Sequence, residues 1–563
     1  MNFIRLFRYM VCGILLLLLF SIFIVCSYKY QKPTADVIST HAMVASAHPI
    51  ASSVGLDILK HGSNAVDAAM AVAFALSMAE PNASGIGGGG FMIIKMADQK
   101  EAVMIDYREM APGKATAEFY YENEASFKEL TLPGFSTSIG VPGLVACADS
   151  ALKKFGTMTL SEILQPSIHL ARNGIPVSEK LNGMIAENYE KISKYPATAE
   201  IYLSDMLPIE AGAILKNEDL AQSYEKLAQR GSDLFYKGDI AKAIVAAVQN
   251  QDGIFELSDL QSYQAKIRKP VVGSYRGYQI ISAAPTTGGG THLIELLNIM
   301  EGFDVRKLGH NSAQLIHIFT EAMKFAYADK SLNTADPDFY DVPVDSFINK
   351  NYAKRLREKI NQNKASFDYT PPELIPTESN STSHLSIIDE QGNIVALTQS
   401  INNFFGSGIV VPGAGILLND HLSDFDDDPG KPNSIAPYKR PTSSIAPTII
   451  LKNGKPFMSL GTPGGTRIIS ALAQIIMNVI DFGMSMDDAI EAPRVHCLTK
   501  ILHVEGRIDQ QVIETLKSMG HKIEVHPNFD NYFGGAQGIL RDSKSHRLFG
   551  GADSRRDGVA IDY

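Results

Sequence analysis

A polar loop runs into two apolar segments in the stretch ESNSTSHLSIIDEQGNIVALTQS, residues 378–400. From Leu385 onward the pattern predicts a β-hairpin whose turn is Gln391-Gly392-Asn393. Thr382 therefore opens a buried strand. If the Ser381–Thr382 bond were cut, Thr382 would carry a nucleophilic hydroxyl and a free α-amine to act as its base, which is one way to activate a threonine. An ordinary Ser/Thr loop before a strand has the same residues, so the assignment depends on the rest of the C-terminal third.

That third contains four more clusters of small polar residues between apolar, strand-like segments. They are Ser400-Ile401-Asn402, residues 419–425 (NDHLSDF), residues 439–444 (KRPTSS) and residues 461–467 (GTPGGTR). The N-terminal half adds the motifs at residues 62–69 (GSNAVDAA), 87–91 (GGGGF) and 106–112 (DYREMAP). In this order the motifs resemble those of γ-glutamyltransferase, also called glutathione hydrolase, a self-cleaving N-terminal nucleophile family. The resemblance extends from about Val37 to Tyr563.

The order of the expected elements indicates a layered α/β fold. Helical spacing covers residues 48–80, where Asn64 is the expected cap of the second helix, and strands are expected between Phe91 and Tyr107. Residues 150–370 are predicted to be mostly helical, and a further helix is expected at 468–480. Strands separated by helical tracts fit an α/β architecture. The family resemblance implies the four-layer αββα sandwich of the N-terminal nucleophile hydrolases.

The resemblance also implies one interleaved domain made from two fragments. Residues 37–381 would form the large subunit, and residues 382–563 the small subunit with the nucleophile at its N-terminus. Cleavage between Ser381 and Thr382 would follow residues 361–379, which are polar, contain prolines and are predicted to be an exposed loop.

In the family, the threonine that matches Thr382 attacks the γ-amide of glutathione and holds the γ-glutamyl group as an ester. Water, an amino acid or a peptide amine then takes that group. Gly464 and Gly465 match the oxyanion-hole residues, and adjacent glycines allow main-chain N–H groups to approach an anion closely. Ser400 matches a hydroxyl residue that hydrogen-bonds to the nucleophile.

Five other positions match residues that bind the α-amino-acid end of the substrate. Arg108 matches the arginine that binds the α-carboxylate, for which a guanidinium is better shaped than an ammonium. Ser443 and Ser444 match a pair that also contacts this carboxylate. Asn402 and Asp424 match residues that hold the α-ammonium.

Two features depart from the family pattern. At the position of His421 the family usually has Gln or Glu contacting the substrate α-ammonium. His421 is a candidate for the same contact, which a histidine makes only when it is neutral. The segment between Asp424 and Lys439 is shorter than in members with a lid over the site. Its residues 426–432 cannot fold back far, so the chain resembles the lidless members that accept larger γ-glutamyl substrates.

Composition excludes several other functions. The net charge of −10 is spread along 563 residues, and no basic cluster suits nucleic acid. The fourteen histidines show no HxxxH or HxH spacing with nearby cysteines, so neither a metal nor an organic cofactor is expected. Cys147 and Cys497 are expected to be two buried thiols, with a single disulfide bridge between them as the alternative.

The N-terminus carries a targeting segment. Residues 1–9 include Arg5 and Arg8, and an apolar run occupies residues 10–27. Since no small-x-small pattern precedes a cleavage point, we expect an uncleaved signal anchor with its positive end in the cytoplasm, and a cleaved signal peptide as the alternative. The enzyme would then be periplasmic or otherwise extracytoplasmic, membrane-anchored in the first case and secreted in the second.

Other functions remain open at this point. The scaffold also suits a related acylase or a poly-γ-glutamate depolymerase. Arg108 and Asp424 favour a substrate with a free amino-acid end over a glutaryl or cephalosporin amide, whereas the missing lid is compatible with polymers. An inactive, uncleaved and anchored binding protein is the alternative from a different class.

Overall fold

The structure is a computed structural model, and the residues that it describes are 36–122, 127–132, 134–367 and 381–563. The predicted cytoplasmic segment 1–9, the signal segment 10–27 and most of the loop 361–379 lie outside these residues. Asp36–Tyr563 form one compact unit. Within the described ranges, no helix is both long enough and apolar enough to cross a membrane.

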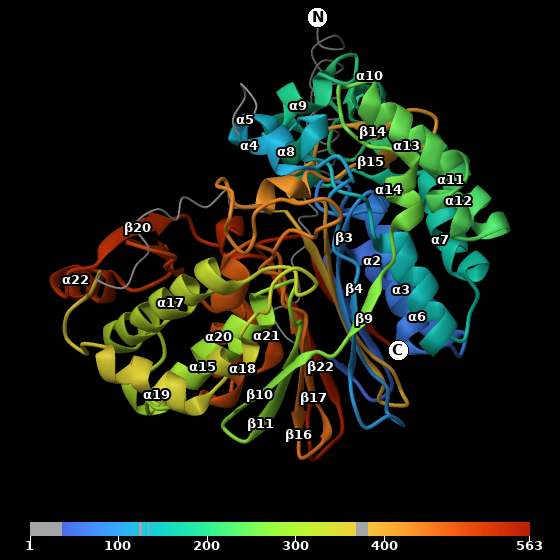
Figure 1. The fold of residues 1–563 in the computed structure, drawn as a ribbon. Coiled ribbons are helices and arrows are strands. Elements are labelled where there is room, and N and C mark those ends of the chain that lie inside the picture. The colour runs from blue at the N-terminus through green and yellow to red at the C-terminus, as the bar shows by residue number, and fades with distance from the viewer. Residues whose placement is uncertain (1–35, 123–126, 133, 368–380) are drawn as a thin grey trace, which may run out of the picture. The chain divides into compact units, whose positions relative to one another are not determined.

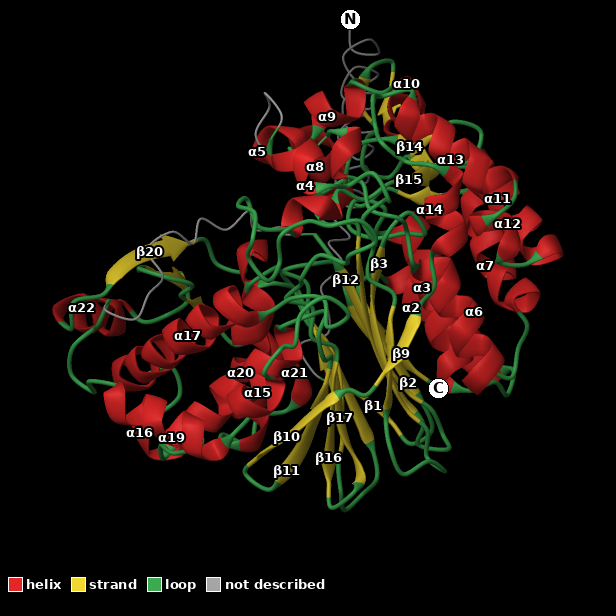
Figure 2. Cartoon of the chain, in the orientation of Figure 1, coloured by secondary structure: helices red, strands yellow, loops and turns green. Residues whose placement is uncertain are grey.

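Two antiparallel sheets of seven strands each form the centre of the fold (Figure 2). The first, called here the nucleophile sheet, has the order β23 (Val559–Asp562), β2 (Met43–Ser46), β12 (Ser383–Ile388), β13 (Ile394–Ser400), β3 (Gly89–Lys95), β4 (Val103–Asp106), β9 (Lys266–Arg268). The second has the order β1 (Val37–Ser39), β22 (Leu548–Ala552), β21 (Gln537–Arg541), β17 (Lys455–Gly461), β16 (Thr448–Lys452), β11 (Tyr278–Ser282), β10 (Val271–Tyr275).

Helices form the two outer layers (Figure 1). The layer beside the nucleophile sheet contains α2 (Pro49–Lys60), α3 (Ala65–Ala79), α6 (Leu144–Phe155), α7 (Leu160–Asn173) and α11 (Glu218–Arg230). The layer beside the second sheet contains α15 (Gly289–Met300), α17 (Ala313–Asn333), α19 (Lys350–Lys359), α20 (Arg467–Ile480) and α21 (Met486–Glu491). The result is the expected four-layer αββα sandwich.

Shorter elements surround these layers. The helices are α4 (Ala117–Tyr121), α5 (Phe127–Leu130), α8 (Glu179–Glu187), α9 (Tyr189–Ser193), α10 (Pro196–Tyr202), α12 (Asp233–Tyr236), α13 (Asp239–Gln249), α14 (Leu257–Ser262), α16 (Val305–Leu308), α18 (Val344–Phe347) and α22 (Gln510–Ser518), with 3-10 turns η1 (Ser136–Ser138), η2 (His421–Asp424) and η3 (Asn531–Phe533). The small sheets pair β5 (Ile175–Pro176) with β8 (Ile214–Leu215), β6 (Leu203–Ser204) with β7 (Leu207–Pro208), β14 (Val410–Val411) with β15 (Ile416–Leu417), and join β18 (Val495–His496), β19 (Ile501–Glu505) and β20 (Lys522–His526).

The central strands of the nucleophile sheet are buried on both faces. In β3, Phe91 and Ile93 belong to the core shared with the second sheet and its helices, whereas Met92 and Ile94 belong to the core shared with α3. This alternation follows from the two-residue period of a strand. Because both faces of these strands are covered, residues at their ends are held in place by packing on two sides.

Several local predictions are confirmed. The hairpin from Leu385 onward is present as β12 and β13, and α20 begins one residue before the expected position. The Asn64 side chain caps α3 by accepting hydrogen bonds from the N–H groups of Val66 and Asp67. Cys147 and Cys497 are free and buried in separate cores, as predicted, and the alternative of a bridge between them is wrong.

One tract differs from its prediction. Residues 150–370 are mostly helical, but β10 and β11 within them form an edge hairpin of the second sheet. Its turn, Arg276-Gly277, has positive φ at both residues, which suits a two-residue hairpin loop. The hairpin is rich in β-branched and aromatic residues, and this strand-forming composition outweighed the helical context on either side.

Candidate active site

Thr382 lies next to Ser400 at one end of the nucleophile sheet. Ser383, the first residue of β12, pairs with Gln399 of β13, so the residues just beyond this pair face each other. The Thr382 hydroxyl donates a hydrogen bond of 3.1 Å to Ser400 Oγ, which also accepts one of 2.9 Å from the Asn402 N–H. Both hydroxyl residues are buried. The structure thus brings together the predicted nucleophile and the predicted hydroxyl partner.

The backbone at Thr382 is strained. Its φ is +130°, a value that a β-branched residue rarely adopts, and such conformations cost on the order of 1–3 kcal/mol. This torsion angle exists only while Thr382 is joined to Ser381. Cleavage of the Ser381–Thr382 bond would therefore release the strain.

The carbonyl group of Thr382 is held by residues that sequence reasoning missed. Arg556 Nη1 donates a 2.9 Å hydrogen bond to Thr382 O and lies 3.2 Å from Glu80 Oε1. Ser383 Oγ donates to the other oxygen of Glu80. Burial raises the pKa of Glu80, and the Arg556 charge opposes this rise. A charged run near the C-terminus, residues 553–557 (DSRRD), was the signal available in the sequence.

Gly464 and Gly465 form the turn between β17 and α20. Their φ values are +130° and +56°, a region that favours glycine. The turn immediately precedes the N-terminus of a 14-residue helix, where main-chain N–H groups and the helix dipole favour an anion. At the end of β17, a Cβ added to Gly461 would come within 2.1 Å of the His384 ring. This contact places the start of the turn against the first residues of β12.

Arg108 is buried, with 1% of its area exposed, and its guanidinium is held on two sides. Nε donates to Pro441 O at 3.1 Å, and Nη2 donates to Thr442 O at 2.8 Å. Nη2 also donates to Asp424 Oδ2 at 2.5 Å. The two carbonyl groups orient the guanidinium, so Arg108 is preorganised for a charge-assisted pair with a carboxylate.

The amide of Asn402 connects Asp424 to the nucleophile. Asn402 Nδ2 donates to Ser423 Oγ at 2.9 Å and to Asp424 Oδ1 at 3.3 Å, while the Asn402 N–H binds Ser400 Oγ. Asn402 therefore links the hydrogen bonds around Thr382, through its backbone N–H, to those around Arg108, through its side chain. The residues expected to act on the acyl group and those expected to bind the amino-acid end lie in one network.

Ser443 and Ser444 follow Thr442, whose carbonyl group holds Arg108. Both are mostly buried. Ser443 Oγ accepts from the Ile445 N–H at 3.1 Å, and its carbonyl oxygen accepts from the Gly288 N–H at 3.0 Å. These bonds fix the backbone that follows Thr442.

Known proteins share this arrangement of sequence and fold. The family model described as "Gamma-glutamyltranspeptidase" matches residues 51–563. The chain belongs to the γ-glutamyltranspeptidase family. It is 40% identical over 531 residues to the glutathione hydrolase proenzyme of Escherichia coli (strain K12), covering 91% of this chain and 90% of the relative. It is 37% identical over 543 residues to the acylase ACY 1 proenzyme of Pseudomonas sp. (strain SE83), covering 95% and 96%.

Solved structures agree with this assignment. A crystal structure of cephalosporin acylase from Bacillus halodurans superposes with a TM-score of 0.87 at 30% identity, covering 96% of this chain and 98% of that one. A Helicobacter pylori γ-glutamyltranspeptidase chain superposes with a TM-score of 0.56 at 40% identity, covering 59% and 95%. The predicted N-terminal nucleophile hydrolase fold is confirmed.

His421, predicted to be a contact for the substrate α-ammonium, faces Glu109. The side chain is buried, and Nδ1 lies 2.8 Å from Glu109 Oε1. The other oxygen of Glu109 lies 3.5 Å from Arg108 Nη1. Glu109, which follows Arg108 directly in the sequence, is thus a further charged residue of the site that was not predicted.

The segment of residues 426–437, predicted to be too short to cover the site, is closed on itself. The Asp426 N–H donates to Asn433 O at 3.0 Å, and Ser434 Oγ donates to Asp428 O at 2.8 Å. The Tyr121 hydroxyl, at the end of α4, donates to Asp426 O at 2.9 Å. The segment is therefore a compact turn fastened to α4.

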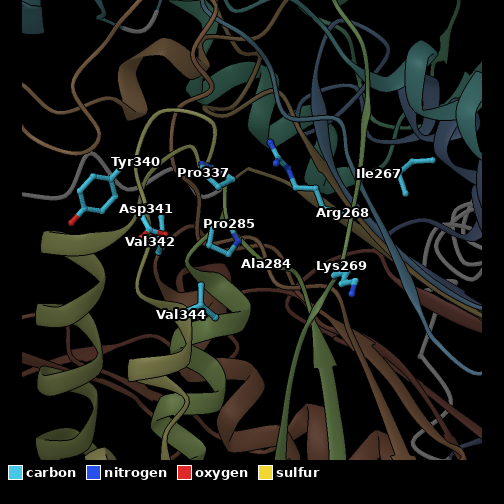
Figure 3. A pocket seen from close by; sticks show the side chains of 10 residues that line it. All are labelled: Ile267, Arg268, Lys269, Ala284, Pro285, Pro337, Tyr340, Asp341, Val342 and Val344. Carbon is cyan, nitrogen blue, oxygen red and sulfur yellow. The ribbon is translucent and has the colours of Figure 1, made fainter.

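A separate cavity of about 430 Å³ lies beside the junction of β9 and β10 (Figure 3). The residues that line it are Ile267, Arg268, Lys269, Ala284, Pro285, Pro337, Tyr340, Asp341, Val342 and Val344. None of the predicted site residues is among them. The Arg268 guanidinium is bound to Asp106 at 2.9 Å and therefore has a structural partner.

Proposed function

We propose that this protein is a γ-glutamyltransferase and glutathione hydrolase that cleaves itself before Thr382. The observation that carries this proposal is the hydrogen-bonded network from Thr382 through Ser400 and Asn402 to the Arg108–Asp424 pair. It combines a nucleophile with an anion-binding and a cation-binding group. An α-amino acid has both charges, so the γ-glutamyl group is the acyl group that this site suits best.

The first half of the reaction transfers the acyl group to the protein. The Thr382 oxygen attacks the γ-carbonyl carbon, and the α-amine released by self-cleavage accepts the hydroxyl proton. The N–H groups around Gly464 and Gly465 stabilise the oxyanion. The amide C–N bond then breaks, the departing amine takes the proton, and a γ-glutamyl ester remains on Thr382.

The second half returns the enzyme to its starting state. Water or the amine of an amino acid or peptide attacks the ester carbonyl, and the Thr382 hydroxyl leaves with a proton from the attacking group. Since residues 426–437 form a short closed turn, we infer an open acyl site that admits bulky donors and acceptors and permits hydrolysis beside transfer.

Self-cleavage uses the same residues in the precursor. The Thr382 hydroxyl oxygen attacks the Ser381 carbonyl carbon, the peptide C–N bond breaks and the Thr382 nitrogen takes the hydroxyl proton, which leaves an ester between Ser381 and Thr382. Water then hydrolyses this ester and restores the Thr382 hydroxyl. The strained φ of Thr382 favours this step, because the strain is absent from the product. The products are the fragments 1–381 and 382–563, which the interleaved strands of the nucleophile sheet hold together.

An acylase is the second candidate, favoured by the similarity to cephalosporin acylase and to acylase ACY 1. The Arg108–Asp424 pair argues against it, because a glutaryl or cephalosporin side chain lacking an α-ammonium leaves Asp424 without its cation. The substrate of a poly-γ-glutamate depolymerase has both charges at its terminal residue. Because the short turn at residues 426–437 is also compatible with a polymer, this activity remains a variant of the proposal.

We also propose that the mature enzyme is extracytoplasmic and anchored through residues 10–27. The positive residues of segment 1–9 and the apolar run behind them support this placement. Fractionation of cells expressing the full chain, with a variant lacking residues 1–27 as control, tests it. Recovery of the full chain in the soluble cytoplasmic fraction would contradict it.

The central experiment combines a denaturing gel, N-terminal sequencing and kinetics. Wild type should give two bands, the smaller beginning at Thr382. It should release p-nitroaniline from γ-glutamyl-p-nitroanilide far faster than from glutaryl-p-nitroanilide. Thr382→Ala should give one inactive chain, whereas Thr398→Ala, on the same hairpin, should still be processed. A single wild-type band would favour an inactive binding protein, and preference for the glutaryl anilide would favour an acylase.

Acceptors of increasing size test the open site. We expect γ-glutamyl transfer to amino acids, dipeptides and longer peptides, with glutamate release beside it. A sharp size limit together with little hydrolysis would show that another part of the chain covers the ester.

A further inference from the structure

A second cluster of charged and imidazole groups lies on the small sheet of β18, β19 and β20. The strands β19 and β20 are parallel, with His503 opposite Glu524. His526 lies two residues after Glu524, and alternate residues of a strand share a face. All three side chains therefore project from the same face of the sheet.

The three side chains point donor atoms at one another. His503 Nδ1 lies 3.0 Å from His526 Nε2 and 3.7 Å from Glu524 Oε2, and His526 Nε2 lies 3.6 Å from Glu524 Oε1. We propose that His503, Glu524 and His526 form a binding site for one divalent transition-metal ion of the zinc class. Two imidazole nitrogens and one carboxylate are a ligand set that Zn²⁺ uses in proteins.

The separations match the geometry of such a site. With bonds of about 2.0–2.1 Å, two ligands of a tetrahedral Zn²⁺ ion are roughly 3.3 Å apart. The three measured separations are close to this value on either side, so small side-chain rotations suffice to centre an ion. The side chains of His503 and His526 are 20% and 13% exposed and that of Glu524 is 55% exposed, which leaves a fourth ligand position open to water.

The imidazole ring of His526 is also oriented by a contact on its side away from the cluster. His526 Nδ1, the nitrogen turned away from the cluster, lies 3.3 Å from Asp530 Oδ2. A carboxylate on the second nitrogen is the arrangement that holds a metal-binding histidine in the required tautomer. The His526 ring also stacks on Tyr532, with ring centroids 4.3 Å apart. Both contacts fix the direction of Nε2 before any ion binds.

Another cluster of two histidines and a glutamate is less suited to bind a metal ion. His317, Glu321 and His521 also gather their donor atoms, but all three are buried. The Lys324 ammonium donates to Glu321 Oε1 at 2.7 Å, and His317 Nε2 binds Asn361 O at 2.8 Å. A cation there would face the charge of Lys324, so this cluster is a structural polar network and serves as an internal comparison.

Titration calorimetry with Zn²⁺ on the mature enzyme tests the proposal, after treatment with EDTA and dialysis. We expect one ion per chain. His503→Gln, His526→Gln and Glu524→Gln should each weaken binding at least tenfold, and Asp530→Asn should weaken it about tenfold as a residue that acts through His526. His169→Gln, an exposed histidine on α7, should leave binding unchanged.

Two results would overturn the site. One is wild-type protein with no saturable Zn²⁺ binding, and the other is binding that survives in Glu524→Gln and His526→Gln but is lost in His521→Gln. Because Glu524 is half exposed, its variant should fold normally, which circular dichroism would verify. A rise in the unfolding temperature with Zn²⁺ in wild type, absent from Glu524→Gln, would give independent support, because an ion that binds only the folded state stabilises it.

Discussion

Arg108 Nη2 lies 2.5 Å from Asp424 Oδ2, so the residues predicted to bind the two opposite charges of one substrate bind each other. The pairing compensates a guanidinium that is almost entirely buried, and an unpaired charge there would be costly. A γ-glutamyl substrate can replace each partner with its own group of the same charge: its α-carboxylate for Asp424 and its α-ammonium for Arg108. The ligand-free site is thus kept in its binding geometry by an internal ion pair.

Arg108→Lys should weaken capture of γ-glutamyl substrates while leaving self-cleavage intact. Lysine keeps the charge but loses the fork that Pro441 O, Thr442 O and a carboxylate share. The loss should be on the order of 2–5 kcal/mol in kcat/KM, mainly through KM. Kinetics with the γ-glutamyl anilide measure it, and Arg172→Lys on the surface is the control. An unchanged KM would remove Arg108 from the substrate site.

Ser400→Ala should slow both self-cleavage and turnover without changing KM. The variant removes the acceptor that orients the Thr382 hydroxyl, and a neutral hydrogen bond contributes about 0.5–1.5 kcal/mol. We therefore expect a loss of up to about tenfold in kcat, and a half-time of processing longer by a similar factor. The exposed Ser53→Ala is the control. Normal rates in Ser400→Ala would show that Thr382 is oriented by other groups.

Lys330 should lower the free energy of unfolding by an amount that depends on pH. Burial lowers the pKa of Lys330 to about 8, although Asp424 and Asp426 oppose the shift. The unfolded pKa is about 10.4, so between these values the unfolded chain binds more protons and stability rises with pH. The penalty is complete below about pH 8 and is relieved as the pH rises toward 10.4.

Lys330→Met should therefore raise the unfolding temperature more at pH 7 than at pH 10. Thermal unfolding of wild type and variant at both pH values measures the difference, and Lys237→Met, at an exposed position, should show no such pH dependence. A difference that grows with pH would reverse the sign and contradict the lowered pKa.

Asp553→Asn should destabilise the fold strongly. Asp553 is fully buried between Arg494 and Arg555, at 2.7 Å and 2.8 Å, and these charges lower its pKa. Removing one member of a buried ionic network typically lowers the free energy of unfolding by about 3–5 kcal/mol, because the remaining charges stay buried. Urea unfolding of the single-chain Thr382→Ala background avoids fragment dissociation.

The surface pair of Asp233 with Lys237 is the control for that prediction. Asp233→Asn should change the free energy of unfolding by about 0–1 kcal/mol.

Since the folded pKa of Asp553 is depressed, its contribution to stability is present above the unfolded pKa of about 3.9 and is lost as the pH falls through the folded value. Equal effects of Asp553→Asn and Asp233→Asn at pH 7 would show that the buried network adds no stability.

Local elements could be predicted because local patterns determine them. The hairpin after Thr382, the Asn64 cap and the helix after Gly465 all follow from side-chain period and hydrogen bonds between near neighbours. The edge hairpin of β10 and β11 was missed because it lies inside a helical tract. The strand that pairs with β11 on its other side, β16, is distant in sequence.

The site divides in the same way. The sequence by itself predicted the nucleophile, the glycine turn and the residues of opposite charge, through motifs that resemble those of the γ-glutamyltransferase family. Only the tertiary structure decided that Arg556 holds the carbonyl group of Thr382, that Glu109 lies between Arg108 and His421, and that His503 faces His526. These contacts join segments brought together by sheet order and packing, and chain separation alone gives no indication of which distant side chains will meet.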